Sequence, residues 1–109
     1  MPDRLEETAE LRRLRKRIDA LDRRLVALLN ERAELAREAG RAKTAAGHRA
    51  IRDAEREREV LLRVSMANTG PIPQADLVAL YRRLFTATRA LESRDRADGR
   101  DRGRDVDGG

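Results

Sequence analysis

Arg32 occupies a position where the surrounding sequence predicts a buried side chain. Apolar residues recur around it at alternating spacings of three and four, the a/d pattern of a helix that packs against partner helices. The positions of this pattern are Leu11, Leu14, Ile18, Leu21, Leu25, Leu28, Arg32, Leu35, Ala39 and Ala42. An unpaired guanidinium in such a seam would cost several kcal/mol. Arg32 therefore predicts either a buried acidic partner or a site that binds an anion.

Two further cations of the same predicted helix differ in their relation to Arg32. Lys43 lies eleven positions after it, which at 100° per residue places both side chains within about 20° of each other and roughly 16 Å apart. Arg15 is about 100° off that face and roughly 25 Å away. Arg32 and Lys43 can therefore flank one pocket. Arg15 is expected either on a solvated basic face or in the pocket of an antiparallel partner chain.

A second group of charged residues recurs at i, i+3 and i+4, as Asp53, Arg56 and Glu57, and so shares one helix face. This spacing is typical of surface salt bridges, and it also suits an acceptor for a substrate hydroxyl beside a third cation. Thr88 and Glu92 show the i, i+4 relation further along the chain.

Three helices are expected to carry these residues. Strong helix formers run from about residue 4 to about residue 46, interrupted only by Gly40. A second helix begins at or just before Asp53, and a third runs from about residue 74 to 92. Glycine followed by prolines within residues 68–73 predicts the loop between them. The fold class is therefore all-α, with three helices per chain, one of them very long.

The first helix is too long for a globule of this size. A helix of about 40 residues measures roughly 60 Å, whereas a compact domain of 109 residues is about 35 Å across. Its far end needs a cover from another chain, and an intertwined homodimeric helical bundle is the simplest closed arrangement.

Composition divides the chain into three parts. Residues 11–92 form the predicted domain, and residues 1–10 an N-terminal extension of the first helix. Residues 93–109 consist mainly of Arg, Asp and Gly with a single valine. Such a segment has too little apolar area to fold, so a disordered tail is predicted.

The remaining composition limits the classes of function. The 109 residues contain no cysteine and no apolar run long enough to cross a membrane, and nothing at the start resembles a secretory signal, so a cytoplasmic location is expected. His48, the lone histidine, is predicted to be an exposed loop residue and not a metal ligand. With no glycine-rich phosphate loop and no nucleophile beside a base, an enzyme of this sequence would work without metal or cofactor.

Three segments of the sequence resemble the all-helical AroQ-class chorismate mutases. They are LRKRIDALDRRLVALLNERAELAREAGRAK at residues 14–43, AIRDAEREREVL at residues 50–61 and LYRRLFTATRALE at residues 80–92. The resemblance depends on the order and spacing of the charged positions. The first ten residues and the tail lie outside it.

The resemblance implies a homodimer of three-helix chains that rearranges chorismate to prephenate in aromatic amino-acid biosynthesis. It implies a substrate pocket formed by Arg32, Lys43, Asp53, Arg56, Glu57, Thr88 and Glu92, with Arg15 contributed by the other subunit. It also allows for a partner enzyme of the shikimate pathway.

The chemistry of that reaction fits these residue types. The rearrangement is unimolecular and leaves partial negative charge on the ether oxygen, so it needs a held substrate conformation and fixed donors. Arginines would anchor the two substrate carboxylates, Lys43 would donate to the ether oxygen and Glu57 would accept from the ring hydroxyl. The resemblance puts Glu92 near the ether oxygen, where many bacterial relatives carry glutamine. Glu92 must be protonated to donate there.

Two other functions stay open on sequence alone. The same fold would also suit an isochorismate pyruvate-lyase or a 4-amino-4-deoxychorismate mutase, because the arginine anchors would be shared. The non-enzymatic alternative is a basic coiled-coil protein that binds nucleic acid, as the net charge of +5 suggests. Interleaved acids and only two aromatic residues, Tyr81 and Phe85, argue against it, so no nucleic-acid or membrane partner is expected.

Overall fold

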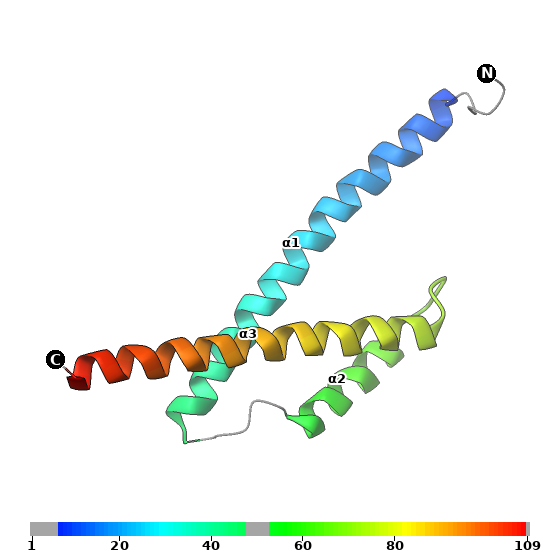
Figure 1. The fold of residues 1–109 in the computed structure, drawn as a ribbon. Helices are drawn as coiled ribbons and strands as arrows, with labels where there is room; N and C mark the ends of the chain where they lie inside the picture. Colours follow the sequence, from blue (N-terminus) through cyan, green and yellow to red (C-terminus); the bar gives the residue numbers. More distant parts are fainter. Residues whose placement is uncertain (1–6, 48–52, 109) are drawn as a thin grey trace. The chain divides into compact units, whose positions relative to one another are not determined.

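The computed structural model of the chain describes residues 7–47 and 53–108, with the backbone alone for residues 100–108. Three helices make up this part of the chain: α1 (Ala9–Ala45), α2 (Ala54–Ala67) and α3 (Gln74–Gly108). None of the described residues lies in a strand. Figure 1 shows the three helices in chain order. The predicted all-α class with three helices is confirmed. Helix α1 is very long, as predicted, and α3, with 35 residues, is nearly as long.

The chain divides into two compact units, residues 1–34 and residues 35–109. The described part of the first unit is the N-terminal portion of α1 with the residues just before it. The second unit holds the last turns of α1 together with α2 and α3.

Helix α1 has 37 residues and starts later than its sequence predicts. The Oγ1 of Thr8 accepts a hydrogen bond from the N–H of Leu11 at 3.0 Å, which satisfies one of the free donors of the first turn. Thr8 is therefore the N-cap, and the expected start near residue 4 is wrong. The helix ends at Ala45, close to the predicted residue 46. Gly47, two residues later, has a φ of +89°, a conformation that residues with side chains rarely adopt and that is typical of a helix C-terminus. His48 lies outside the described residues.

The apolar stripe of α1 is largely uncovered. Ile18, Leu21, Leu25 and Leu28 have exposed fractions of 54% to 58%. These are the side chains whose spacing predicts a seam between helices, and leaving them in water costs the free energy that their burial would provide. The stripe therefore has the pattern of a helix–helix seam without a cover.

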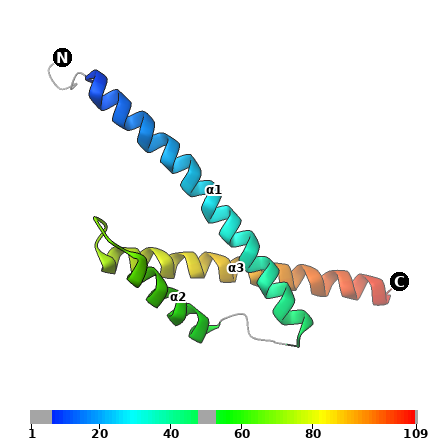
Figure 2. The same ribbon diagram turned by 180° about the vertical axis from the view of Figure 1, so that it is seen from behind.

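Helices α2 and α3 pack together as a hairpin, as both views show (Figures 1 and 2). In the connecting loop, the side-chain amide of Asn68 donates to the carbonyl of Ile72 at 3.0 Å, and its Oδ1 accepts from the N–H of Gly70. Gly70 has a φ of +83°, which explains the glycine. Among the described residues, the only buried apolar side chain is Phe85, in edge-to-face contact with Tyr81.

Helix α3 continues to Gly108, well past the expected end at Glu92. The predicted disordered tail at residues 93–109 is helical as far as it is described. Two features favour this. Asp95 is paired with Arg37 of α1, and Arg94 and Asp98 have opposite charges at the helix-stabilising i, i+4 spacing. The boundaries of the domain itself stay a prediction.

Within the described residues, no helix combines the length and the apolar character needed to cross a membrane.

Candidate active site

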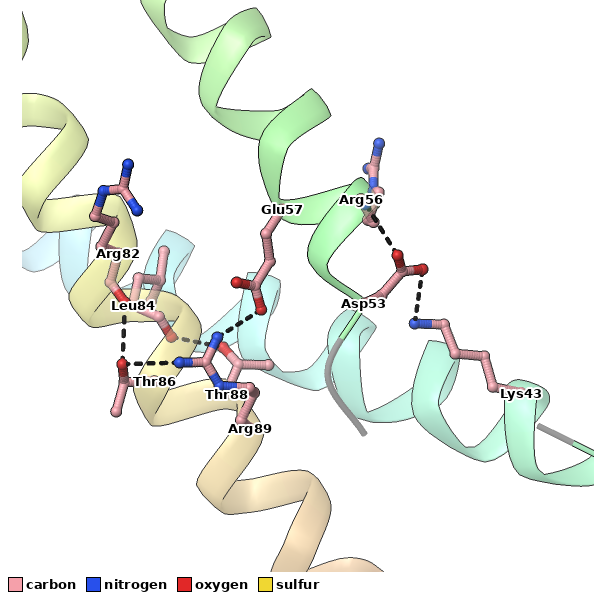
Figure 3. Close-up of polar contacts among 9 residues, drawn as sticks. All are labelled: Lys43, Asp53, Arg56, Glu57, Arg82, Leu84, Thr86, Thr88 and Arg89. Atoms are coloured by element: carbon pink, nitrogen blue, oxygen red, sulfur yellow. Dashed lines mark hydrogen bonds and ion pairs between the residues drawn. The ribbon is translucent and has the colours of Figure 1, made fainter. Parts of the chain in front are cut away.

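Lys43 at the end of α1 and Asp53 at the start of α2 form an ion pair, with Nζ and Oδ2 3.6 Å apart (Figure 3). Asp53 is also the N-cap of α2, since its Oδ1 accepts a hydrogen bond from the N–H of Arg56 at 2.9 Å. This backbone hydrogen bond, assisted by the charge of Lys43, lowers the pKa of Asp53 below its ordinary value. Asp53 therefore has a structural role besides any contact with a ligand.

Glu57 of α2 is held by a residue that the sequence did not single out, Arg89 of α3. The Nη1 of Arg89 donates to Oε2 of Glu57 at 2.5 Å, and its Nη2 donates to the hydroxyl of Thr86 at 3.2 Å (Figure 3). Both partners of the ion pair are largely buried, with side-chain exposures of 28% and 17%. Helical spacing could not identify Arg89, because its partner lies on another helix.

Thr88 is buried, at 7% exposure. Its hydroxyl donates to the backbone carbonyl of Leu84 at 2.9 Å, a common arrangement for threonine within a helix. The oxygen still has an acceptor lone pair, so it can receive a hydrogen bond from a ligand.

Glu92 of α3 lies against Gly40 of α1. A Cβ on Gly40 would come within 3.3 Å of Cγ of Glu92. Partial burial raises the pKa of Glu92 above its ordinary value, and the nearby positive charge of Lys43 opposes this effect only in part. Arg96 also opposes the increase, while Asp95 and Glu57 reinforce it. The protonated form of Glu92 is therefore favoured relative to an exposed glutamate.

The guanidinium of Arg56 pairs with a residue outside the predicted site. This partner is Glu59 of the same helix, at 3.1 Å, and the side chain of Arg56 is 54% exposed. In the structure Arg56 therefore makes the surface salt bridge that its spacing also allowed.

Arg15 and Arg32 belong to the other compact unit, residues 1–34. Arg15 is exposed and pairs with Glu7 at 2.9 Å. Arg32 lies on the same uninterrupted helix as Lys43. The second unit thus contains six of the eight predicted site residues: Lys43, Asp53, Arg56, Glu57, Thr88 and Glu92.

No group of three or more potential metal ligands occurs in the described ranges 7–47 and 53–108. The second unit instead brings together cations and carboxylates from three helices: Lys43, Asp53, Glu57, Arg89 and Glu92. Such a set of charged side chains can hold an anionic ligand with hydroxyl groups.

A model of the family "chorismate mutase type II" matches residues 14–93, which is most of the chain. The chain belongs to this family. The family predicted from the sequence is thereby confirmed.

Individual relatives agree with the family match. A bifunctional chorismate mutase/prephenate dehydratase from Aquifex aeolicus is 40% identical over 89 residues, covering 78% of this chain and 24% of the relative. A bifunctional enzyme of the same name from Stutzerimonas stutzeri is 37% identical over 92 residues, covering 81% of this chain and 25% of its own length. The chain thus spans about a quarter of the length of these relatives.

Solved structures agree as well. The chorismate mutase from Thermus thermophilus, in its form II, superposes with a TM-score of 0.73 at 35% identity. The match covers 78% of this chain and 96% of that one. The similarity therefore extends over nearly the whole of that chorismate mutase chain.

The family match ends at residue 93, one residue after Glu92. All eight predicted site residues fall inside the matched range. Residues 94–108, where α3 continues, fall outside it.

Proposed function

We propose that this chain rearranges chorismate to prephenate, with Lys43 and Glu92 as the groups that act on the breaking carbon–oxygen bond. The proposal is supported by one observation: the side chain of Glu92 of α3 lies against Gly40 of α1, three residues and so about one helical turn before Lys43. Two hydrogen-bond donors from different helices can thus face one ligand oxygen, provided that Glu92 is protonated. Its raised pKa favours that state.

The reaction needs no group transfer. Carbon–oxygen cleavage and carbon–carbon formation occur in the same step, and partial negative charge develops on the ether oxygen as its bond breaks. A fixed ammonium group and a protonated carboxyl at that oxygen stabilise the charge in the transition state more than in the bound substrate. They accelerate the reaction because they need not reorganise when the charge appears.

Glu57 is proposed to accept the hydrogen bond of the ring hydroxyl. Its Oε2 is already bonded to Arg89, but a carboxylate has further lone pairs on both oxygens. Arg89 fixes the position of the acceptor, and a fixed acceptor loses less entropy when the substrate binds.

The two substrate carboxylates are proposed to bind Arg32 and Arg56, together with Arg15 of a second copy. Arginine offers a planar, paired set of donors that matches a carboxylate. Because the exposed Arg56 is paired with Glu59 of its own helix, substrate binding requires that it exchange this surface partner for the ligand. A surface ion pair of this kind costs little to break.

The second copy of the chain is proposed as the cover of the α1 stripe. Four consecutive a/d side chains of α1, from Ile18 to Leu28, are more than half exposed. Their spacing of three and four residues is that of helices that pack along their length. An antiparallel arrangement would bring the N-terminal half of one α1 to the site of the other. A cytoplasmic location and a partner enzyme of the shikimate pathway stay predictions of the sequence.

The decisive experiment follows the loss of chorismate absorbance with purified protein and identifies the product. We expect prephenate from the wild type and a decrease of about a hundredfold in kcat/KM for Arg32→Ala, equivalent to about 3 kcal/mol of transition-state stabilisation. Arg24→Ala is the matched control, because it removes an exposed guanidinium from the same helix. Circular dichroism establishes that both variants are folded.

Absence of turnover with the wild-type protein would refute the proposal. Isochorismate and 4-amino-4-deoxychorismate are then the substrates to assay. A folded Arg32→Ala variant as active as Arg24→Ala would remove Arg32 from the site and leave the reaction itself established.

A further inference from the structure

Gly40 stands where the side chain of Glu92 passes closest to α1. A Cβ built on Gly40 would lie 3.3 Å from Cγ, 3.4 Å from Cδ and 3.7 Å from Oε1 of Glu92. The first of these distances is tighter than ordinary carbon–carbon contact. Gly40 is not needed for backbone conformation, because it lies inside α1, where alanine is the better residue by helix propensity.

The contact involves most of the glutamate side chain and not only its tip. A methyl group at residue 40 would meet Cγ first, so a rotation of the carboxyl group alone could not relieve it. The Glu92 side chain as a whole would have to change its rotamer or shift by a few tenths of an ångström.

A separate ion pair limits the other way of relieving the contact, a movement of α3 away from α1. Arg37 donates through Nε to Oδ2 of Asp95 at 2.9 Å and through Nη2 to Oδ1 at 2.7 Å. Each partner lies three residues from the contact, Arg37 before Gly40 and Asp95 after Glu92, and so about one helical turn away. Two parallel hydrogen bonds fix both the distance and the orientation of the two helices at this point.

We propose that Gly40 is a positioning residue for Glu92: its missing side chain leaves the space in which the Glu92 carboxyl is held beside Lys43, and the Arg37–Asp95 pair keeps that space from widening. This inference rests on the proposed function and extends it. It names the residues that place the second donor, none of which touches the substrate.

Charged groups from each neighbouring helix act on Glu92. Lys43 of α1 and Arg96 of α3 stabilise its ionised form, while Asp95 of α3, Glu57 of α2 and partial burial favour its protonated form. A displacement of the carboxyl changes its distance to all of these groups. The protonation of Glu92 therefore reports its position, independently of turnover.

Gly40→Ala tests the proposal, with Gly99→Ala as the matched control. Both glycines lie inside helices, so both changes raise helix propensity, but a Cβ on Gly99 has no atom within 4 Å. The Glu92 carboxyl carbon is followed by NMR in protein labelled with 13C-glutamate, and its signal is assigned from its absence in Glu92→Gln. Chorismate kinetics are measured in parallel on the full chain.

We expect Gly40→Ala to move the pKa of Glu92 back toward that of an exposed glutamate, and to lower kcat about tenfold or more while KM changes less than about twofold. Gly99→Ala should change neither. In a Glu92→Ala background, adding Gly40→Ala should have no further effect on kcat, because the side chain with which alanine collides is gone.

An unchanged Glu92 titration in Gly40→Ala would overturn the inference, as would an equal loss of kcat in the Glu92→Ala background. If the wild-type protein fails to convert chorismate, the proposed function is lost, yet the NMR titration still decides whether Gly40 positions Glu92.

Discussion

Arg89 of α3 donates a 2.5 Å hydrogen bond to Glu57 of α2, joining the two helices at a carboxylate expected to bind substrate. Neither side chain is more than 28% exposed. Arg89, which is not among the predicted site residues, thus fixes the position of Glu57, the proposed acceptor for the ring hydroxyl. Positioning of Glu57 and cohesion of the α2–α3 hairpin depend on the same contact.

Replacing Arg89 by methionine removes this contact, and the same change at Arg82 controls for the loss of a positive charge. We expect a loss of stability of about 1 to 3 kcal/mol, because a partly buried charged hydrogen bond is removed and Glu57 stays behind without it. KM for chorismate should rise about tenfold, equivalent to about 1.4 kcal/mol of binding. Denaturant unfolding and steady-state kinetics measure the two effects.

Arg82→Met, at an exposed position of the same helix, is the control and should change stability and KM far less. Equal effects of the two variants would show that Arg89 has no special role.

The pH dependence of turnover should depend on Glu92. Its pKa is raised above the ordinary 4.5, mainly by burial, and only the protonated form can donate to the ether oxygen. Activity is therefore highest below that pKa and decreases as pH rises through it, by about tenfold for each further pH unit until residual catalysis remains. In Glu92→Gln the amide donates at every pH, so the profile should be flat over this range. A variant whose activity declines as steeply as that of the wild type would exclude Glu92 as the titrating group.

The Arg37–Asp95 pair should stabilise the fold in a pH-dependent way. The hydrogen bonds from Arg37 hold the pKa of Asp95 below its ordinary 3.8. A lowered folded-state pKa means that the stabilisation is present above the unfolded-state pKa and is lost as pH falls through the folded-state pKa. Asp95→Asn should therefore lower Tm at neutral pH and have little effect once the pH is well below 3.8. Asp22→Asn, which changes an exposed aspartate of α1, is the control. A Tm difference that persists at the lowest pH would indicate a cause other than the ion pair.

A site shared between two chains predicts complementation. Arg15→Ala and Arg32→Ala should each be nearly inactive alone. A mixed dimer, however, contains one site with both arginines intact and one with neither. After exchange of subunits at equal concentrations, about a quarter of the wild-type activity should return, since half of the dimers are mixed and each has one working site. Exchange is verified by mass spectrometry of differently tagged chains. If exchange is complete and no activity returns, Arg15 and Arg32 of one chain belong to the same active site, and the proposal of a shared site is wrong.

Helical periodicity was sufficient for the fold class because each helix of this chain carries its own signal. The spacing of the leucines indicates α1, and the glycine and prolines of residues 68–73 indicate the loop before α3. The start of α1 was missed by several residues, since helix propensity does not favour Thr8 over its neighbours and the cap is visible only as a hydrogen bond to Leu11.

Local sequence could not predict contacts made across helices. The composition of residues 93–109 indicates disorder, but it does not reveal that Asp95 meets Arg37 more than 50 residues earlier in the chain. Arg89 is not apparent from local sequence for the same reason, because its partner Glu57 lies on another helix. The proposed site residues follow from their spacing and from the family resemblance, and six of them, five charged residues and Thr88, lie in one compact unit.

The proposed dimer makes the stability of this chain depend on its concentration. In the proposed dimer, burying Ile18, Leu21, Leu25 and Leu28 is part of folding itself, so the folded state contains two chains and the unfolded state contains one. Each tenfold dilution then lowers the free energy of unfolding by about 1.4 kcal/mol per dimer. The amount of protein that a cell makes would thus set not only the rate of prephenate formation but also how much of each chain is folded.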